Sequence, residues 1–179
     1  MAIKPVVRMG NKELSTPSLA VKEISTALQP IIQDMRDTMQ KEQGVGIAAP
    51  QIAYNHRIIM FGFEENERYP EEVAIPFTIL INPTIEILDE EMVDGWEGCL
   101  SVPGLRGIVP RYKKIRYSGL DLNGQVISRV AEGFHARVLQ HECDHIDGIL
   151  YPERMKSMRN FGFEEEMQER MYSTIHKPE

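Results

Sequence analysis

One stretch of the sequence, "GFHARVLQHECDHID" at residues 133 to 147, constrains the fold more than any other. Its apolar residues and histidines recur at spacings of four, three and four, at Phe134, Val138, His141 and His145. This is the period of one helical face, so we predict a helix from about 133 to 147 that ends before Gly148. Because the two histidines continue an apolar stripe, they should point inward, where an unligated pair would be costly. The sequence therefore predicts a helix at the centre of the protein.

The two histidines of this helix are spaced to bind a metal ion. His141 and His145 project from adjacent turns at nearly the same angle, so their rings can converge on one cation of the size of zinc or iron. Glu142 is one position further round, where its carboxylate can take a proton from a bound water and later deliver it to a leaving group. The alternative is an amphipathic helix whose histidines lie four apart by chance. Their inward direction favours the metal site.

A catalytic metal site needs a third protein ligand and an open position. In the metzincin pattern this ligand is a histidine six residues after the second one, and Tyr151 stands there instead. Cys143 lies on the same helix, about 200° round from His141, so it should point away as a small buried thiol. The tail glutamates Glu164–Glu166 could supply a carboxylate, as in thermolysin-like proteases, although a run of charges usually faces solvent. They remain an alternative.

Cys99 is the other candidate for the third ligand. It lies in "WEGCLSV", a strand-like stretch whose glycine lets the backbone approach a neighbour closely. A lone cysteine in a strand usually belongs to the core, but a pair of inward histidines needs a partner and few other residues are available. The chain has only two cysteines, which is too few for a disulfide framework and fits a reducing compartment. In such a compartment a cysteine is free to bind metal.

A glycine-rich stretch, "GVGIAAPQ" at residues 44 to 51, needs a separate explanation. It fits the dinucleotide pattern G-x-G-x-x-A, but that motif follows a strand and opens a helix, whereas this stretch closes a helix and leads into strands. The glycines instead predict backbone that passes close to another element or to an extended peptide. The amide of Gln51 could donate a hydrogen bond to a developing oxyanion. The alternative for Gln51 is a bond to nearby backbone.

The rest of the chain predicts an α+β domain. A helix is expected from about Pro30 to Glu42, and short apolar runs between about 57 and 130 are typical of strands. Within them, Asn123-Gly124 predicts a hairpin with a type I′ turn. Helix, many strands and helix in this order predict antiparallel or mixed sheets packed around a central helix, in one domain that spans residues 1–179. The tail from 155 to 179 carries no functional prediction.

Composition excludes several classes of protein. With 42% hydrophobic and 26% charged residues, the chain is typical of a folded globular protein. The net charge of −7 argues against general nucleic-acid binding, and the basic stretch "RYKKIR" at 111 to 116 is expected to be a solvated strand face. No apolar run approaches the roughly 20 residues that span a bilayer, and the N-terminus lacks the features of a signal or transit peptide. We expect a cytoplasmic protein that does not bind membranes.

Taken together, "GVGIAAPQ", "EGCLS" and "QHECDH" resemble the three signature motifs of the peptide deformylase family, in the same order and with similar separations. The resemblance extends from about residue 30 to residue 151. It implies an enzyme that removes the formyl group from the N-terminal formylmethionine of new polypeptides, near the ribosome. It also implies sheets around a central metal-binding helix. One divalent metal ion is implied, usually Fe(II), with zinc, nickel or cobalt also possible.

The resemblance also implies roles for individual residues. The implied metal ligands are Cys99, His141 and His145. Glu142 would be the general acid and base, and Gln51 with the backbone N–H of Leu100 would bind the oxyanion. The implied substrate contacts are the backbone around Val45, Gly46 and Gly98 and a methionine pocket at Phe134 and Val138. Arg137 stands where much of the family has an apolar residue, and "HARVLQHECDH" is more similar to the branch of mitochondrial and plant deformylases and some bacterial enzymes. The resemblance therefore does not predict how Arg137 affects the rim of the pocket.

Overall fold

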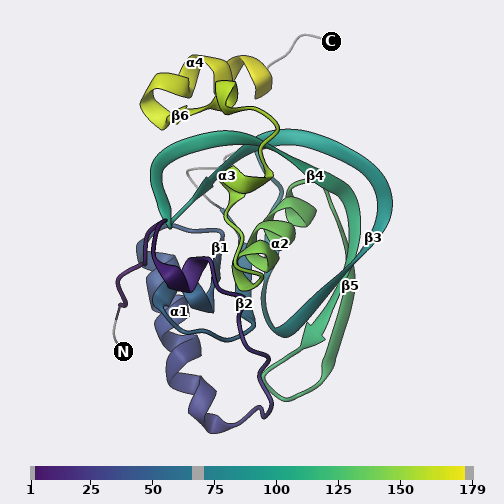
Figure 1. Ribbon diagram of the computed structural model, residues 1–179. Coiled ribbons are helices and arrows are strands. Elements are labelled where there is room, and N and C mark those ends of the chain that lie inside the picture. The colour runs from purple at the N-terminus through teal and green to yellow at the C-terminus, as the bar shows by residue number, and fades with distance from the viewer. Residues whose placement is uncertain (1–2, 66–70, 176–179) are drawn as a thin grey trace.

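A long, bent sheet encloses one helix. The computed structural model describes residues 3–65 and 71–175 (Figure 1). Its strands are β1 (Gly46–Ala48), β2 (Ile58–Phe63), β3 (Ile75–Cys99), β4 (Val102–Leu120), β5 (Val126–Glu132) and β6 (Phe161–Phe163). Its α-helices are α1 (Gln29–Lys41), α2 (Gly133–Ile146), α3 (Tyr151–Arg154) and α4 (Glu164–Ile175). Short 3-10 helices span Lys12–Leu14, Thr26–Leu28, Ala49–Ile52 and Met158–Asn160. The predicted α+β class is confirmed.

The sheet is antiparallel, in the order β1-β2-β3-β4-β5, with β6 added to β4. In Figure 1, β3 and β4 form an arch over α2. The sequence analysis expected short strands between about 57 and 130, but β3 continues as one strand of 25 residues. Irregular register near Asn82, whose φ is +51°, and again at Asp89 and at Glu97 bends the strand without reversing it. Register irregularities therefore bend one long strand where several short strands were expected.

Both predicted helices form where expected. α1 begins one residue before Pro30, so the proline occupies the first turn, where its missing N–H costs no hydrogen bond. α2 starts at the predicted residue 133 and ends at Ile146, followed by Gly148 with φ of +76°. Most of α2 is buried, including polar residues of its second half. The predicted position of this helix at the centre of the protein is confirmed.

The hairpin predicted at Asn123-Gly124 joins β4 to β5, but its turn type differs from the prediction. A type I′ turn needs positive φ at both central residues, and here only Gly124 has it, at +76°. The side chain of Asp121 accepts hydrogen bonds from the N–H groups of Asn123 and Gln125, each at 2.8 Å. These bonds stabilise a longer loop. The type I′ prediction was therefore wrong because a side chain, rather than the two central residues alone, fixes the turn.

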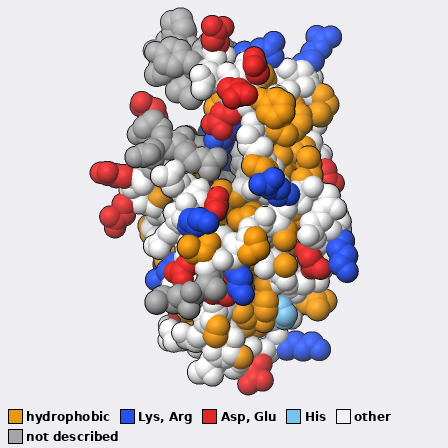
Figure 2. Space-filling view, turned by 90° about the vertical axis from the view of Figure 1, so that its left-hand side faces the viewer, with side chains coloured by type: hydrophobic (Ala, Val, Ile, Leu, Met, Phe, Trp, Pro, Cys, Tyr) orange, Lys and Arg blue, Asp and Glu red, His pale blue; other side chains and the backbone are white. Residues whose placement is uncertain are grey.

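The charges on the surface are mixed. Lys113, Lys114 and Arg116 of β4 pair across the sheet with glutamates and are half exposed, as expected of a solvated strand face. Arg111, which begins the same basic stretch, departs from this expectation because it is buried. Figure 2 shows acidic and basic side chains interspersed with apolar ones on one face of the molecule. Among the described helices, none is long and apolar enough to cross a membrane.

Candidate active site

Three side chains that could hold a metal ion meet where β3 ends against α2. Their ligand atoms, from Cys99, His141 and His145, all lie within 4.8 Å of one another, and Cys99 Sγ is 3.2 Å from His145 Nε2. A tetrahedral ion with bonds of about 2.0–2.3 Å keeps its ligand atoms roughly 3.5 Å apart. The three donors are therefore near enough that they could hold one cation.

The surroundings of Cys99 favour the thiolate, which is the form that binds metal. Burial by itself would raise the pKa of this thiol, but the nearby His145 and His141 lower the pKa well below its usual value. The backbone N–H of Ser101 and the amide of Gln51 also point at Sγ, at 3.4 and 3.6 Å. Ser101 lies in the tight turn from β3 to β4, so the turn itself directs one donor at the sulfur.

Glu97 orients His141, and the sequence analysis missed it. Its Oε2 lies 2.8 Å from His141 Nδ1, which leaves Nε2 of the ring for the metal. Burial would raise the pKa of Glu97, but Arg111 and His141 outweigh burial and hold the pKa far below the usual range. A signal was present in the sequence: residues two apart in a strand share a face, so Glu97 must point to the same side as Cys99.

A network of buried charges supports Glu97 from behind. Arg111 binds both of its carboxylate oxygens, at 2.9 and 3.0 Å, and also contacts Asp144 of α2. Arg137 binds Glu97 Oε1 at 2.9 Å and the carbonyl oxygens of Val93 and Val109 at 2.6 and 2.7 Å. The sequence analysis left the effect of Arg137 on the pocket rim undecided. In the structure, its guanidinium group links α2 to β3 and β4.

Glu142 lies on the other side of the ligand cluster, against β1. A Cβ added to Gly46 would collide with the Glu142 carboxylate, which explains why a glycine is required there. Burial raises the pKa of Glu142 to about 7, and the charges of His141 and His145 oppose this shift only in part. A carboxyl group with a pKa near neutrality can both accept and donate a proton at physiological pH.

Gln51 makes the bond to nearby backbone that the sequence analysis gave as an alternative, and its amide N–H₂ group lies beside Cys99. Its Oε1 accepts a hydrogen bond from the backbone N–H of Ala48 at 2.8 Å, as a structural glutamine would. Its Nε2 donates to Ser101 Oγ at 3.1 Å and points at Cys99 Sγ. The backbone bond fixes the amide, and the N–H₂ group faces the metal donors.

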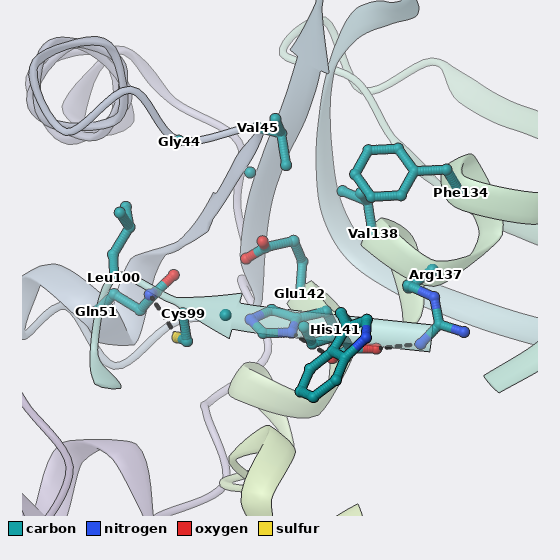
Figure 3. Close-up of a pocket in the computed structure, with 14 residues that line it drawn as sticks. Gly44, Val45, Gln51, Cys99, Leu100, Phe134, Arg137, Val138, His141 and Glu142 are labelled. Carbon is teal, nitrogen blue, oxygen red and sulfur yellow. Dashed lines mark hydrogen bonds and ion pairs between the residues drawn. The ribbon is translucent and has the colours of Figure 1, made fainter. Parts of the chain in front are cut away.

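These groups surround one pocket. The predicted site residues that line it are Val45, Gly46, Gln51, Gly98, Cys99, Leu100, Phe134, Val138, His141 and Glu142. His145 is buried behind them. Figure 3 shows Phe134 and Val138 on one wall, Gln51 and Leu100 on the other, and Glu142 between them. The structure therefore brings together residues from three separate sequence motifs.

The remaining ligand candidates do not join the cluster. Cys143 belongs to the hydrophobic core on the far side of α2, where burial raises the pKa of its thiol. Glu164 pairs with Arg106, while Glu165 and Glu166 are exposed, so the predicted alternative of a tail ligand is not supported. Tyr151 is no ligand either: its ring stacks against that of His141, with centroids 6.1 Å apart.

Three possible metal donors beside a buried carboxyl group with a raised pKa are the arrangement expected of a metal-dependent hydrolase, since a structural site would be closed by four protein ligands. Comparison with known proteins identifies which hydrolase. The sequence model of the polypeptide deformylase family matches residues 3–161. The chain belongs to this family, whose members are metal-dependent hydrolases that act on N-formyl peptides.

Individual relatives agree over nearly the whole chain. Peptide deformylase 2 of Ralstonia nicotianae is 54% identical over 91% of this chain and 93% of its own length. Peptide deformylase 1 of Bordetella pertussis is 56% identical over the same shares. Among solved structures, a Met-Ala-Ser-bound class I type b peptide deformylase of Acinetobacter baumannii has a TM-score of 0.82 and 38% identity, over 86% of this chain and 99% of that one. The enzyme of Thermotoga maritima has a TM-score of 0.78 and 29% identity, over 88% of this chain and 100% of that one.

Proposed function

We propose that Cys99, His141 and His145 hold one divalent metal ion and that Glu142 is the general acid and base for removal of formyl from the N-terminal formylmethionine of nascent polypeptides. One observation carries this proposal: three side chains that could hold a metal ion lie together, and a buried carboxyl group with a raised pKa lines the same pocket as two of them. The predicted setting is the cytoplasm, near the ribosome, with residues 1–179 as one catalytic domain.

The native metal is proposed to be Fe(II), as the resemblance to the family implies. One thiolate and two imidazoles also accept zinc, nickel or cobalt, so the donor set does not select the metal. Metal analysis after anaerobic purification tests this part of the proposal. Zinc as the main metal in protein kept away from oxygen would contradict it.

The peptide is proposed to bind as an added strand between β1 and β3. β1 pairs only with β2, and β3 pairs with β2 only between Ile75 and Ile81, among the described residues. The other edges of Gly46 and Gly98 therefore remain for a partner, and both residues line the pocket beside Val45. An extended peptide can fill such a gap with backbone hydrogen bonds.

The methionine side chain is proposed to lie against the α2 wall of the pocket. Phe134 and Val138 provide apolar surface there, and the ring of Phe134 is held by an edge contact with Phe63, with centroids 6.1 Å apart. A flexible thioether side chain suits such a wall. The charged group of Arg137 is bound by Glu97 and by backbone carbonyls, which limits the penalty of placing it beside an apolar side chain.

In the proposed reaction, each residue either transfers a proton or donates a hydrogen bond. When bound, the cation supplies Lewis-acid chemistry: it lowers the pKa of a water and polarises the formyl oxygen. Glu142 takes a proton as water attacks the formyl carbon, and then delivers it to the leaving amine. The amide of Gln51 and the backbone N–H of Leu100 donate to the oxygen as it becomes negative. A formyl group is smaller than any peptide acyl group, so a tight pocket would exclude ordinary peptide bonds.

The test is formate release from a formyl-Met tripeptide, with the matching acetyl-Met tripeptide as control. We expect formate from the first, no hydrolysis of the second, loss of activity after chelation and recovery on addition of Fe(II). Cys99→Ala should lose the metal and the activity, while the triple variant Glu164→Gln, Glu165→Gln, Glu166→Gln should keep its metal. The reverse pattern would reject the proposed ligand set in favour of a tail carboxylate.

A further inference from the structure

The C-terminal segment from 161 to 171 has no part in the reaction described above, yet it packs against the outside of the arch. β6 pairs with Leu105–Gly107 of β4, and α4 follows directly, with its Met167 buried against Gly162. Figure 1 shows β6 and α4 above the arch and α2 within it. The match to the family's sequence model ends at residue 161, so most of this segment lies beyond the matched region.

Arg106 lies at the centre of this contact, between the tail and the end of β3. Its side chain is only 4% exposed, and its Nη2 binds Glu164 Oε1 at 2.9 Å. Its Nη1 lies directly against Gly98, where an added Cβ would collide with the guanidinium group. The guanidinium of Arg106 therefore occupies the space that a side chain at position 98 would need.

The guanidinium supports Gly98 from the face opposite to the metal donors. Side chains alternate along a strand, so Cys99 points toward α2 while a side chain at position 98 would point outward, where Arg106 lies. Arg106 does not line the pocket, so it does not reach the reacting atoms. It does pack against Gly98, the strand edge proposed to receive the peptide.

We propose that Arg106 and Glu164 are positioning residues for the peptide substrate, and that the C-terminal segment holds the edge at Gly98 in the extended form that pairs with the peptide. This inference rests on the proposed function. Without the Glu164 carboxylate, the guanidinium gains freedom to turn toward solvent and away from Gly98. The strand edge then has to be ordered by the peptide itself, which weakens binding.

The first test is Glu164→Gln, measured with a formyl-Met tripeptide and with formyl-methionine amide. We expect KM for the tripeptide to rise about threefold to tenfold, with kcat within about twofold of the unchanged enzyme and metal content unaltered. The shorter substrate has less backbone to pair with Gly98, so its KM should change less. Glu165→Gln and Glu166→Gln remove the same charge from exposed neighbours and should leave KM unchanged. Glu164→Asp keeps the charge and should recover part of the loss.

The second test uses the partner residue. Arg106→Lys should also raise KM for the tripeptide, and the double variant with Glu164→Gln should be no worse than the more impaired single variant, because both act through one contact. The proposal is overturned if Glu164→Gln behaves like Glu165→Gln, or if kcat and metal content fall with KM, which would indicate a general loss of structure. Failure of the unchanged enzyme to release formate would instead reject the proposed function.

Discussion

The two sides of the metal-ligand cluster each hold a buried glutamate, and the two differ in the protonation state they favour. Behind the cluster, Arg111 and His141 overcome the effect of burial and hold the pKa of Glu97 far below the usual range. In front, burial raises the pKa of Glu142 to about 7. The same type of side chain thus favours the charged form in one region and the neutral form in the other, because cations outweigh burial at Glu97 and burial outweighs them at Glu142.

Hydrogen bonding follows the same division. The Glu97 carboxylate accepts from Arg111, Arg137 and His141 at distances of 2.8 to 3.0 Å. Within the described part of the chain, Oε2 of Glu142 has no hydrogen-bond partner. The hydrogen bonds of Glu97 therefore hold His141 in place, whereas Glu142 keeps one carboxylate oxygen available to the reacting molecules.

The largest effect is expected from Glu142→Gln, which removes the proton carrier and keeps its shape. Formate release should fall by about 10²- to 10⁴-fold, the usual range for a general acid or base. Elemental analysis should find the same metal content as in the unchanged enzyme. If the variant loses its metal, Glu142 helps to hold the ion, and the proposed difference in role between Glu97 and Glu142 is wrong.

The matching change behind the cluster is Glu97→Gln. Because this glutamate orients His141, we expect metal affinity to fall about 10- to 100-fold, as for other carboxylates that support a ligand. Competition with a chelator measures the affinity. Excess metal should restore most of the activity, which it should not do for Glu142→Gln. A fully loaded variant that stays inactive would show that Glu97 takes part in the reaction itself.

A smaller effect is expected from Arg137→Met, which alters a residue that both lines the pocket and binds Glu97. The added apolar surface should change kcat/KM for formyl-Met relative to formyl-Phe tripeptides by about twofold to tenfold, or roughly 0.4 to 1.4 kcal/mol. Parallel assays of the two substrates provide the ratio. An unchanged ratio would place Arg137 with the supporting network alone.

The smallest effect should come from Cys143→Ala, on the same helix as the ligands but turned into the core. Metal content and formate release should not change, and urea unfolding should show a loss of about 1 kcal/mol from the smaller side chain. Cys99→Ala is the matched comparison, because it should lose both the metal and the activity. Metal loss in the Cys143 variant would mean that the two thiols have been assigned to the wrong sides of α2.

Local patterns predicted α1 and α2 and indicated His141 and His145 as candidate metal ligands. The period of Phe134, Val138 and the histidines fixed α2 to within one residue, because a buried helical face repeats regularly in sequence. The third donor was less accessible. From the residues alone, Cys99 and the tail glutamates were alternative candidates for the third ligand. Only the resemblance to a family favoured Cys99, because a single cysteine in a strand shows no repeating pattern in sequence.

The supporting network was not predicted, because nothing local reveals it. Arg111 meets Glu97 across 14 residues and Asp144 across 33. Such contacts depend on the bends of β3 and on the exact register of β4, which short apolar runs do not encode. The prediction of a type I′ turn at Asn123 was wrong for a related reason, since hydrogen bonds to the side chain of Asp121 stabilise a different backbone geometry.

The origin of the donors in two distant elements has a consequence for folding. Cys99 and His145 are 46 residues apart in sequence, so the proposed ion would join the end of β3 to the central helix in the manner of a cross-link. An ion that needs both elements in place binds the native chain far better than the unfolded one. The melting temperature should therefore rise with the logarithm of free metal concentration above the dissociation constant, and chelation should loosen the arch as well as stop the reaction.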